Sequence, residues 1–380
     1  MDRNTILHWL KESDPQRLAD LWHTADQQRR ACVGDEVQLR GLVEISNHCR
    51  RRCLYCGLRA ENTTLLRYRM SDDEILACAH QATEFGFGTL VLQSGEDPAF
   101  DGRRVAQLVR RIKQETSLAV TLSLGERSPA ELAAWREAGA DRYLLRFETS
   151  NVSLYRRIHP LPGSSRNFAA CVPSLSGQSI ERLRLLGVLR RLGYEVGSGM
   201  MIGIPSQTYE DLAADIALFA ELELDMIGVG PYLRHPATPM ADAGRWPDAP
   251  PDQQAPADEL TTCKVIALAR LVCPWANIPA TTALAVQGGA EAWKRGLQCG
   301  ANVLMPNLTP KKYREQYEIY PGKAQAGLEN ILDGQPLRRL PDLLKVFLAE
   351  IGRRPGSGRG DSPAFLRRNP TRTLPATVDG

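Results

Sequence analysis

Two hydrophobic rhythms alternate along the chain. After an amphipathic N-terminal stretch, short apolar runs alternate with longer segments in which apolar residues recur every three or four positions. Short apolar runs bounded by turn residues predict buried strands, and the longer period predicts amphipathic helices. The expected strands lie at 37–46, 89–93, 118–125, 142–148, 195–204, 226–233, 277–284 and 301–306.

This alternation predicts the α/β class, with a parallel sheet closed as a complete (β/α)8 TIM-like barrel. The expected organisation is an N-terminal helical segment at 1–36, a barrel at 37–352 and a flexible, basic Pro/Gly-rich tail at 353–380. Two stretches rich in Pro and small residues, 161–178 and 241–258, are expected to be loop insertions. An open doubly wound sheet is the alternative.

Charge and hydropathy narrow the class of protein. Charged residues make up 24% of the chain and the net charge is +3, so neither nucleic acid nor a membrane is an expected partner. No apolar run approaches the roughly 20 residues that cross a bilayer, and the N-terminus lacks the order of a signal peptide. A cytoplasmic protein is therefore expected, and in that compartment a cysteine cluster more often binds metal or reacts than forms a disulfide.

The stretch "SNHCRRRCLYCG" at 46–57 groups Cys49, Cys53 and Cys56 directly after the first expected strand. Loops at the carboxyl ends of barrel strands carry active sites. Three thiolates leave one iron of a 4Fe-4S cube open, where a reactant can bind, whereas structural sites usually supply four ligands. A zinc site completed by His48, or a chance cluster, is the alternative.

Strand parity predicts which side chains enter the barrel. Along 142–148, Arg142, Arg146 and Glu148 share one face, and Tyr143 and Leu145 share the other. Burying charged groups against an apolar helical layer is costly, so the charged face is expected to point inward.

The CxxxCxxC loop, with the aromatic Tyr55 before its last cysteine, resembles that of the radical S-adenosylmethionine (SAM) enzymes. In that superfamily the loop holds a 4Fe-4S cluster whose open iron binds the amino and carboxylate groups of SAM. The turn "QSGEDP" offers Ser94, Gly95 and Glu96 where these enzymes have a Gly-Gly-Glu-like turn.

A narrower resemblance extends from about Val37 to Lys323. Strings such as "RYRMSDDEI", "TLSLGE", "EAGADRYLLRFET", "DMIGVGPYLRHPATP", "GANVLMPNLTP" and "YPGK" follow one another in the order seen in the HydE maturases of FeFe-hydrogenase, which are biotin synthase-like radical enzymes. The resemblance implies SAM contacts from Arg146, Glu148, Arg182, Met201 and Met226. It implies substrate-cavity roles for Thr121, Arg142, Thr281, Thr282 and Tyr317.

The resemblance also implies an activity and partners. A 5'-deoxyadenosyl radical would act on an iron carbonyl cyanide unit carrying cysteine, to build the diiron subcluster of the hydrogenase. The maturase HydG would deliver this small organometallic substrate, the product would pass toward HydF, and a reductant protein would supply electrons. The fixed charge of Arg142 suits an anionic substrate, although Arg142 could equally pair with Glu148 or Asp141 as a structural bridge.

Only one cluster is expected. The chain has no cysteine after Tyr320 for the accessory cluster that some HydE members carry. The other cysteines, Cys32, Cys78, Cys171, Cys263, Cys273 and Cys299, are scattered and are expected to be isolated thiols. Two further interpretations are a carbon-directed radical enzyme of the methylornithine synthase or biotin synthase kind, and a noncatalytic scaffold that stores or donates iron–sulfur clusters.

Overall fold

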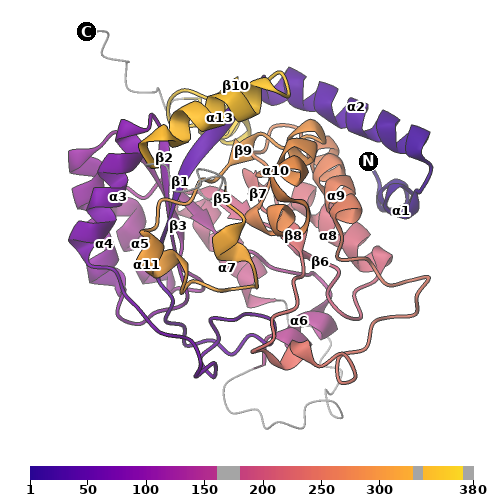
Figure 1. Ribbon diagram of the computed structural model, residues 1–380, viewed down its shortest axis with the longest axis horizontal. Helices are drawn as coiled ribbons and strands as arrows, with labels where there is room; N and C mark the ends of the chain where they lie inside the picture. Colours follow the sequence, from indigo (N-terminus) through magenta and orange to yellow (C-terminus); the bar gives the residue numbers. More distant parts are fainter. Residues whose placement is uncertain (161–179, 328–336, 371–380) are drawn as a thin grey trace.

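The computed structural model describes residues 1–160, 180–327 and 337–370. A curved parallel sheet forms its centre, and helices cover the outside of the sheet (Figure 1). The ladder runs through β1 (Glu36–Ser46), β2 (Thr89–Ser94), β3 (Ala119–Ser123), β4 (Arg142–Leu144), β5 (Glu195–Ser198) and β7 (Met226–Ile227). β9 (Val303–Leu304) and β10 (Arg354–Pro355) pair with β1, and β6 (Met201–Ile202) pairs with β8 (Gly230–Pro231).

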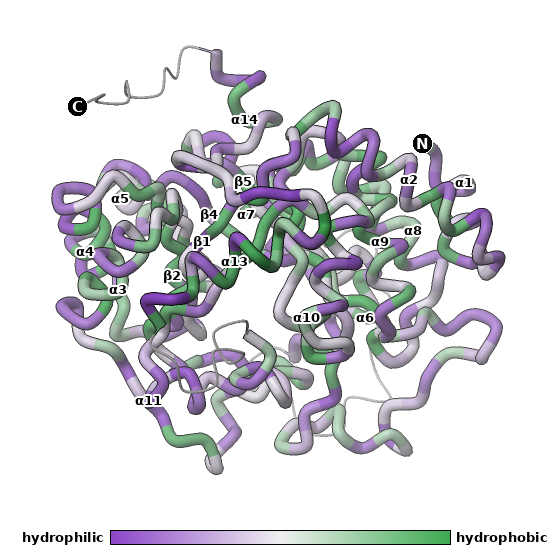
Figure 2. Tube along the Cα trace, turned by 45° about the horizontal axis from the view of Figure 1, so that its top comes forward, coloured by the Kyte–Doolittle hydropathy of each residue, from purple (hydrophilic) through white to green (hydrophobic). Residues whose placement is uncertain are grey.

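The helices between these strands are α3 (Asp72–Glu84), α4 (Gly102–Glu115), α5 (Pro129–Glu137), α6 (Val152–Ile158), α7 (Glu181–Arg191), α8 (Tyr209–Glu221), α9 (Glu259–Val272) and α10 (Thr282–Gln298). Short elements follow or interrupt them: η1 (Pro239–Ala241), α11 (Lys311–Arg314), η2 (Lys323–Gln325), η3 (Leu337–Arg339), α13 (Leu340–Ala349) and α14 (Pro363–Arg368). Capping boxes at Ser71, Ser128 and Thr208 begin α3, α5 and α8, because each hydroxyl accepts a hydrogen bond from an otherwise unpaired amide. Apolar side chains fill the interface between sheet and helices. Hydrophobic residues recur along the central strands and the helices around them in Figure 2.

The predicted alternation of strands and helices is confirmed. The sheet is parallel and curved, as predicted, but its closure into a complete barrel is not confirmed. The regular ladder ends at β7. Beyond it, isolated parallel bridges from Met226 to Asn277 and from Pro279 to Val303 lead back toward β1. The expected strand at 277–284 is thus not a regular strand, and the sheet is a partial barrel.

A close backbone approach divides the expected strand at 195–204 into β5 and β6. Gly199 has φ 156° between them, and a Cβ at this position would lie 1.8 Å from the carbonyl oxygen of Gly228. Only glycine fits so near another backbone. The same approach explains why 226–233 contains the two short strands β7 and β8.

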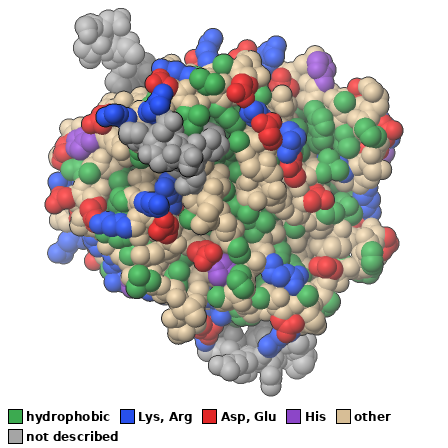
Figure 3. All heavy atoms as spheres, viewed as in Figure 1, with side chains coloured by type: hydrophobic (Ala, Val, Ile, Leu, Met, Phe, Trp, Pro, Cys, Tyr) green, Lys and Arg blue, Asp and Glu red, His purple; other side chains and the backbone are tan. Residues whose placement is uncertain are grey.

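The predicted N-terminal helices are α1 (Arg3–Lys11) and α2 (Pro15–Val33), which pack against α8 and α9. The expected loop at 241–258 contains no helix or regular strand after η1, whereas the expected insertion at 161–178 lies outside the described residues. Among the residues described, no helix combines the length and apolarity needed to cross a membrane. Positive, negative and apolar side chains are interspersed over the face in Figure 3.

The prediction of a flexible tail at 353–380 is wrong for residues 353–370, and 371–380 lie outside the described residues. This segment closes the floor of the barrel: β10 extends the sheet at β1, and the chain then crosses beneath the strands. Arg359 Nη2 lies 2.6 Å from Asp141 Oδ1, and the backbone amide of Ser362 donates to Glu195 Oε1 at 3.0 Å. Its polar composition misled the prediction because its charges find buried partners.

Arg142 lies in this floor. Its side chain points into the barrel, as parity predicted, but it forms ion pairs of 2.6 Å with both Glu195 and Asp361. The expected cavity role for Arg142 is therefore not supported by its position. The alternative of a structural bridge is the better description, although the partners differ from the expected Glu148 and Asp141.

Replacing Asp361 with Ala should lower the free energy of unfolding by about 3 kcal/mol, because the fully buried Arg142 loses one of its two carboxylate partners. Equilibrium urea unfolding of the full chain measures this difference. The control Asp252→Ala, at an exposed loop position, should change stability by no more than about 0.5 kcal/mol. Equal midpoints for the two variants would show that the C-terminal segment is not a structural part of the barrel.

Candidate functional site

A cavity of about 290 Å³ opens at the carboxyl ends of the strands. It brings together nearly all of the side chains singled out in the sequence. From the expected cluster and SAM sets these are Cys49, Cys53, Tyr55, Cys56, Ser94, Gly95, Glu96, Arg146, Glu148, Arg182, Met201 and Met226; from the substrate set they are Thr121, Thr281, Thr282 and Tyr317. Arg142 is not among the lining residues.

The cysteine loop follows β1 and is held by backbone hydrogen bonds to distant segments. The amide of Leu54 donates to the carbonyl of Ile158 at 2.9 Å. The amide of Gly57 donates to the carbonyl of Ile319 at 3.0 Å. A Cβ at Gly57 would lie 2.0 Å from the carbonyl oxygen of Glu318, so glycine is needed there. These bonds fix the loop against the segments on both sides of it.

The three thiols suit an iron–sulfur cube by chemistry and surroundings. The amides of Arg51 and Glu96 each lie 3.4 Å from Cys49 Sγ, where they would stabilise a thiolate. Burial raises the pKa of Cys53 to about 11, and the nearby cation of Arg182 offsets part of this increase. Across the described part of the chain, no three His, Cys, Asp or Glu side chains converge on a single-ion site. A cube needs no such convergence, since each thiolate binds a separate iron.

The turn after β2 packs closely against the cysteine loop. A Cβ at Gly95 would lie 2.3 Å from the carbonyl oxygen of His48 and 2.6 Å from Cys49 Cβ, so a larger residue would separate the two segments. The buried Glu96 carboxylate accepts a hydrogen bond from the amide of Glu126 at 2.9 Å and pairs with Arg50 at 3.3 Å. Glu96 therefore braces the turn from within.

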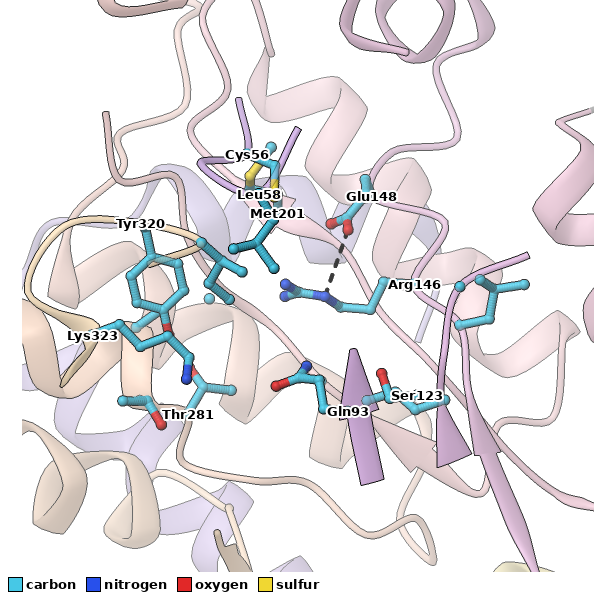
Figure 4. Close-up of a pocket in the computed structure, with 18 of the residues that line it drawn as sticks. Cys56, Leu58, Gln93, Ser123, Arg146, Glu148, Met201, Thr281, Tyr320 and Lys323 are labelled. Atoms are coloured by element: carbon cyan, nitrogen blue, oxygen red, sulfur yellow. Dashed lines mark ion pairs between the residues drawn. The ribbon is translucent and has the colours of Figure 1, made fainter. Parts of the chain in front are cut away.

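Glu148 is the electrostatic centre of the cavity. Arg146 Nε and Arg182 Nη1 lie 3.7 and 3.8 Å from its Oε1, and Figure 4 shows Arg146 between Cys56 and Met201 on one side and Gln93 and Thr281 on the other. Glu148 Oε2 is buried without a hydrogen-bond partner. A buried carboxylate oxygen is costly to leave unpaired, so this atom fits a hydrogen-bond donor or a cationic group of a ligand.

His159 is a neighbour of this centre that sequence reasoning missed. Tyr55 Oη lies 3.1 Å from His159 Nε2 and 3.4 Å from Glu148 Oε1. Burial holds the pKa of His159 well below its usual range, so the ring is neutral. No motif marks His159, because it follows α6 and meets Tyr55 only through the fold.

The opposite end of the cavity is more polar than expected. Thr121 Oγ1 is buried there without a partner. Arg40 and Lys323, which sequence reasoning did not single out, also line the wall. Arg40 Nη1 lies 2.9 Å from Met226 Sδ, and Lys323 forms a buried ion pair with Glu44 of β1. Lys323 belongs to the string "YPGK", which was the only available signal.

The predicted parity of 142–148 holds for most positions. Tyr143 stacks on Trp135 of α5 with ring centroids 6.3 Å apart, so it faces the helices. Arg146 and Glu148 face the cavity, as predicted. Leu145 belongs to the core and also borders the cavity, because the regular strand ends at Leu144 and strict alternation ends with it.

Similarity to known proteins extends along most of the chain. Residues 43–219 match the profile of the Radical SAM superfamily. The chain is 43% identical to the FeFe-hydrogenase maturase subunit HydE of Thermotoga maritima over 90% of this chain and 88% of that protein. It is 26% identical to the 3-methylornithine synthase of Methanosarcina acetivorans over 76% of this chain and 74% of that protein.

Solved structures show the same fold. Methylornithine synthase (PylB) superposes with a TM-score of 0.72 at 24% identity, covering 93% of this chain and 94% of that one. The maturase HydG from Carboxydothermus hydrogenoformans superposes with a TM-score of 0.71 at 16% identity, covering 94% of this chain and 76% of that one.

Glu148→Gln should weaken SAM binding by about 10-fold to 100-fold, because the variant keeps the shape of the side chain and loses the negative charge that strengthens its hydrogen bond to the ligand. Calorimetric titration of the anaerobically reconstituted protein measures the affinity, and iron content should be unchanged. Glu61→Gln, on the half-exposed loop beyond the cysteines, is the matched control and should bind SAM normally. Unaltered affinity in Glu148→Gln would remove Glu148 from the binding site.

Proposed function

The chain belongs to the HydE family of radical SAM enzymes, and from that premise we propose that it acts in the maturation of FeFe-hydrogenase. Radical SAM enzymes use a 4Fe-4S cluster and SAM. The proposed substrate is an iron carbonyl cyanide unit carrying cysteine, and the proposed product is a precursor of the diiron subcluster. The observation that carries the proposal is that the three-cysteine loop and the unpaired Glu148 oxygen open into one cavity.

We assign the cluster to Cys49, Cys53 and Cys56. When bound, the reduced cluster and SAM supply a 5'-deoxyadenosyl radical, which is chemistry that belongs to the cofactors. The protein's part is to place the reactants and keep water out. Glu148 would accept a hydrogen bond from the amino group of SAM. Arg182, 7% exposed and bonded to the carbonyl of Arg146 at 2.8 Å, would keep Arg146 and Glu148 in position.

The remaining SAM contacts proposed are Tyr55, Ser94, Gly95, Glu96, Arg146, Met201 and Met226. For the substrate we propose Thr121, Thr281, Thr282 and Tyr317, which line the same cavity. Hydroxyl groups suit carbonyl and cyanide ligands, because a hydroxyl can donate a hydrogen bond without adding charge. The hydroxyl of Thr281 already donates to the carbonyl of Val229 at 3.0 Å, so Thr121 and Tyr317 are the better donors among this set. The cavity's cations would favour an anionic substrate.

We further propose that HydG delivers the substrate, that the product passes toward HydF, and that a separate protein reduces the cluster. A carbon-directed radical reaction is the alternative within the same superfamily. A biotin synthase-like reaction would need a second cluster, and among the described residues Cys78, Cys263, Cys273 and Cys299 do not line the cavity. A noncatalytic scaffold would form no 5'-deoxyadenosine with SAM and reductant.

Expression of this chain in cells that make FeFe-hydrogenase but lack their own HydE should restore hydrogen production. Cys53→Ala should abolish the rescue, because the cluster loses one of three anchors, and Cys32→Ala on α2 should retain it. Hydrogenase activity in lysates is the measurement. If the wild type cleaves SAM in vitro yet gives no rescue, the carbon-directed alternative is favoured.

The reconstituted chain should bind about four irons, the content of a single cube. Iron analysis combined with the electron paramagnetic resonance spectrum of the reduced protein measures the content. A reproducible value of about six to eight, half of which survives Cys49→Ala, would contradict a single cluster.

A further inference from the structure

Glu148 has a strained backbone. Its φ is 67°, in the left-handed region that side chains other than glycine rarely adopt. The amide of Thr149 donates to the carbonyl of Phe147 at 2.9 Å, which closes a three-residue turn centred on Glu148. A residue keeps such a conformation only where its surroundings enforce it. The direction of the Glu148 side chain therefore depends on what holds this turn.

One side of the turn is held by the sheet. The amide of Glu148 donates to the carbonyl of Gly199 at 3.2 Å, and the carbonyl of Glu148 accepts from the amide of Met201 at 3.0 Å. These bonds attach the turn to the junction of β5 and β6. They fix the position of the Glu148 backbone and leave the chain after it to be held by something else.

The other side is held by a buried carboxylate on α8. Asp215 is 0% exposed, and its Oδ1 accepts from the amide of Ser150 at 2.6 Å. Among the described residues no cation forms an ion pair with Asp215, and its Oδ2 accepts no hydrogen bond. Against the larger effect of burial, the nearby side chains of Ser150 and Thr149 act to lower its pKa. One turn earlier on α8, Asp211 accepts from the side chain of Asn151 at 3.0 Å. Hydrogen bonds to two carboxylates of α8 thus hold the segment directly after Glu148.

A buried carboxylate without a cationic partner is costly, and a packed apolar side chain would be more stable at this position. The acidic group therefore calls for a role other than stability. Burial raises the pKa of Asp215 to about 7, which agrees with a carboxylate held in an apolar setting. The hydrogen bond to Ser150 is the contact through which it can act on the cavity.

We propose that Asp215 is a positioning residue for SAM: by accepting the amide hydrogen of Ser150, it holds the strained turn that directs Glu148 into the cavity. Asp215 does not line the cavity and would not touch SAM. The inference rests on the proposed function, because it takes Glu148 as a group that binds SAM.

Two variants of Asp215 test whether the hydrogen bond to the Ser150 amide is what supports SAM binding. Asp215→Asn keeps an oxygen acceptor of the same shape, whereas Asp215→Ala removes it. With the reconstituted full chain, Asp215→Ala should weaken SAM binding by about 10-fold or more and lose the SAM-induced change in the spectrum of the reduced cluster. Asp215→Asn should restore binding to within about threefold of the wild type.

Leu212→Ala is the matched control, since it truncates another fully buried side chain of α8. It should lower the melting temperature as a cavity-creating change and leave SAM affinity intact. The inference is overturned if Asp215→Ala binds SAM as tightly as the wild type. It is also overturned if Asp215→Asn is as impaired as Asp215→Ala, or if Leu212→Ala loses SAM affinity to the same extent.

If Asp215→Ala does not fold, hydrogen exchange of the wild-type protein tests whether the Ser150 amide is held by Asp215. The amide of Ser150 should exchange slowly in the cluster-free chain and more slowly still in the loaded chain with SAM. Fast exchange that SAM does not change would overturn the inference. A loaded wild type that does not bind SAM at all would instead contradict the proposed function, while slow exchange at Ser150 in the cluster-free chain would still support the anchor.

Discussion

Charge buried inside the barrel is the constraint on which the rest of this structure depends. A sheet curved into a barrel has little room for water, so each inward-facing ionic group needs a partner or pays a large desolvation cost. At the floor the chain meets this need by returning its own C-terminal segment to Arg142 and Glu195. At the side wall, Lys323 reaches back to Glu44.

The cavity end treats charge differently. Arg182 is buried and paired with Glu126 at 2.9 Å, yet one oxygen of Glu148 is left without a partner in the same region. Arg40 lies between the floor and the cavity, since it lines the cavity and donates to the carbonyl of Gly360; burial together with the cation of Arg142 lowers its pKa to about 9. Most charged groups of the floor therefore form ion pairs, whereas the cavity contains buried polar atoms that have no partner within the protein. That contrast is what separates a structural end from a ligand-binding end.

Glycines allow the functional loops to meet closely enough to use those groups. Gly95 lets the turn after β2 rest against the cysteine loop, and Gly199 lets β5 pass β7 so that Met201 and Met226 face one cavity. The strained Glu148 is attached to the second of these approaches, because its amide donates to the carbonyl of Gly199 at 3.2 Å. Backbone geometry therefore sets the position of Glu148, and the neighbouring charged groups determine its interactions.

The sequence by itself determined the alternation of strands and helices, the three-cysteine loop and the family, because these depend on local periodicity and on residues close together in the chain. It also placed Tyr143 toward the helices, since strand parity is local, whereas Glu148 lies beyond the regular strand and faces the interior because of a turn that the tertiary structure holds. Only the tertiary structure decided which interior charges are paired. Arg142 meets Asp361, His159 meets Tyr55 and Asp215 meets Ser150 across 65 residues or more. Such contacts follow from how the barrel curves and where the C-terminal segment crosses it, and local patterns carry no record of either.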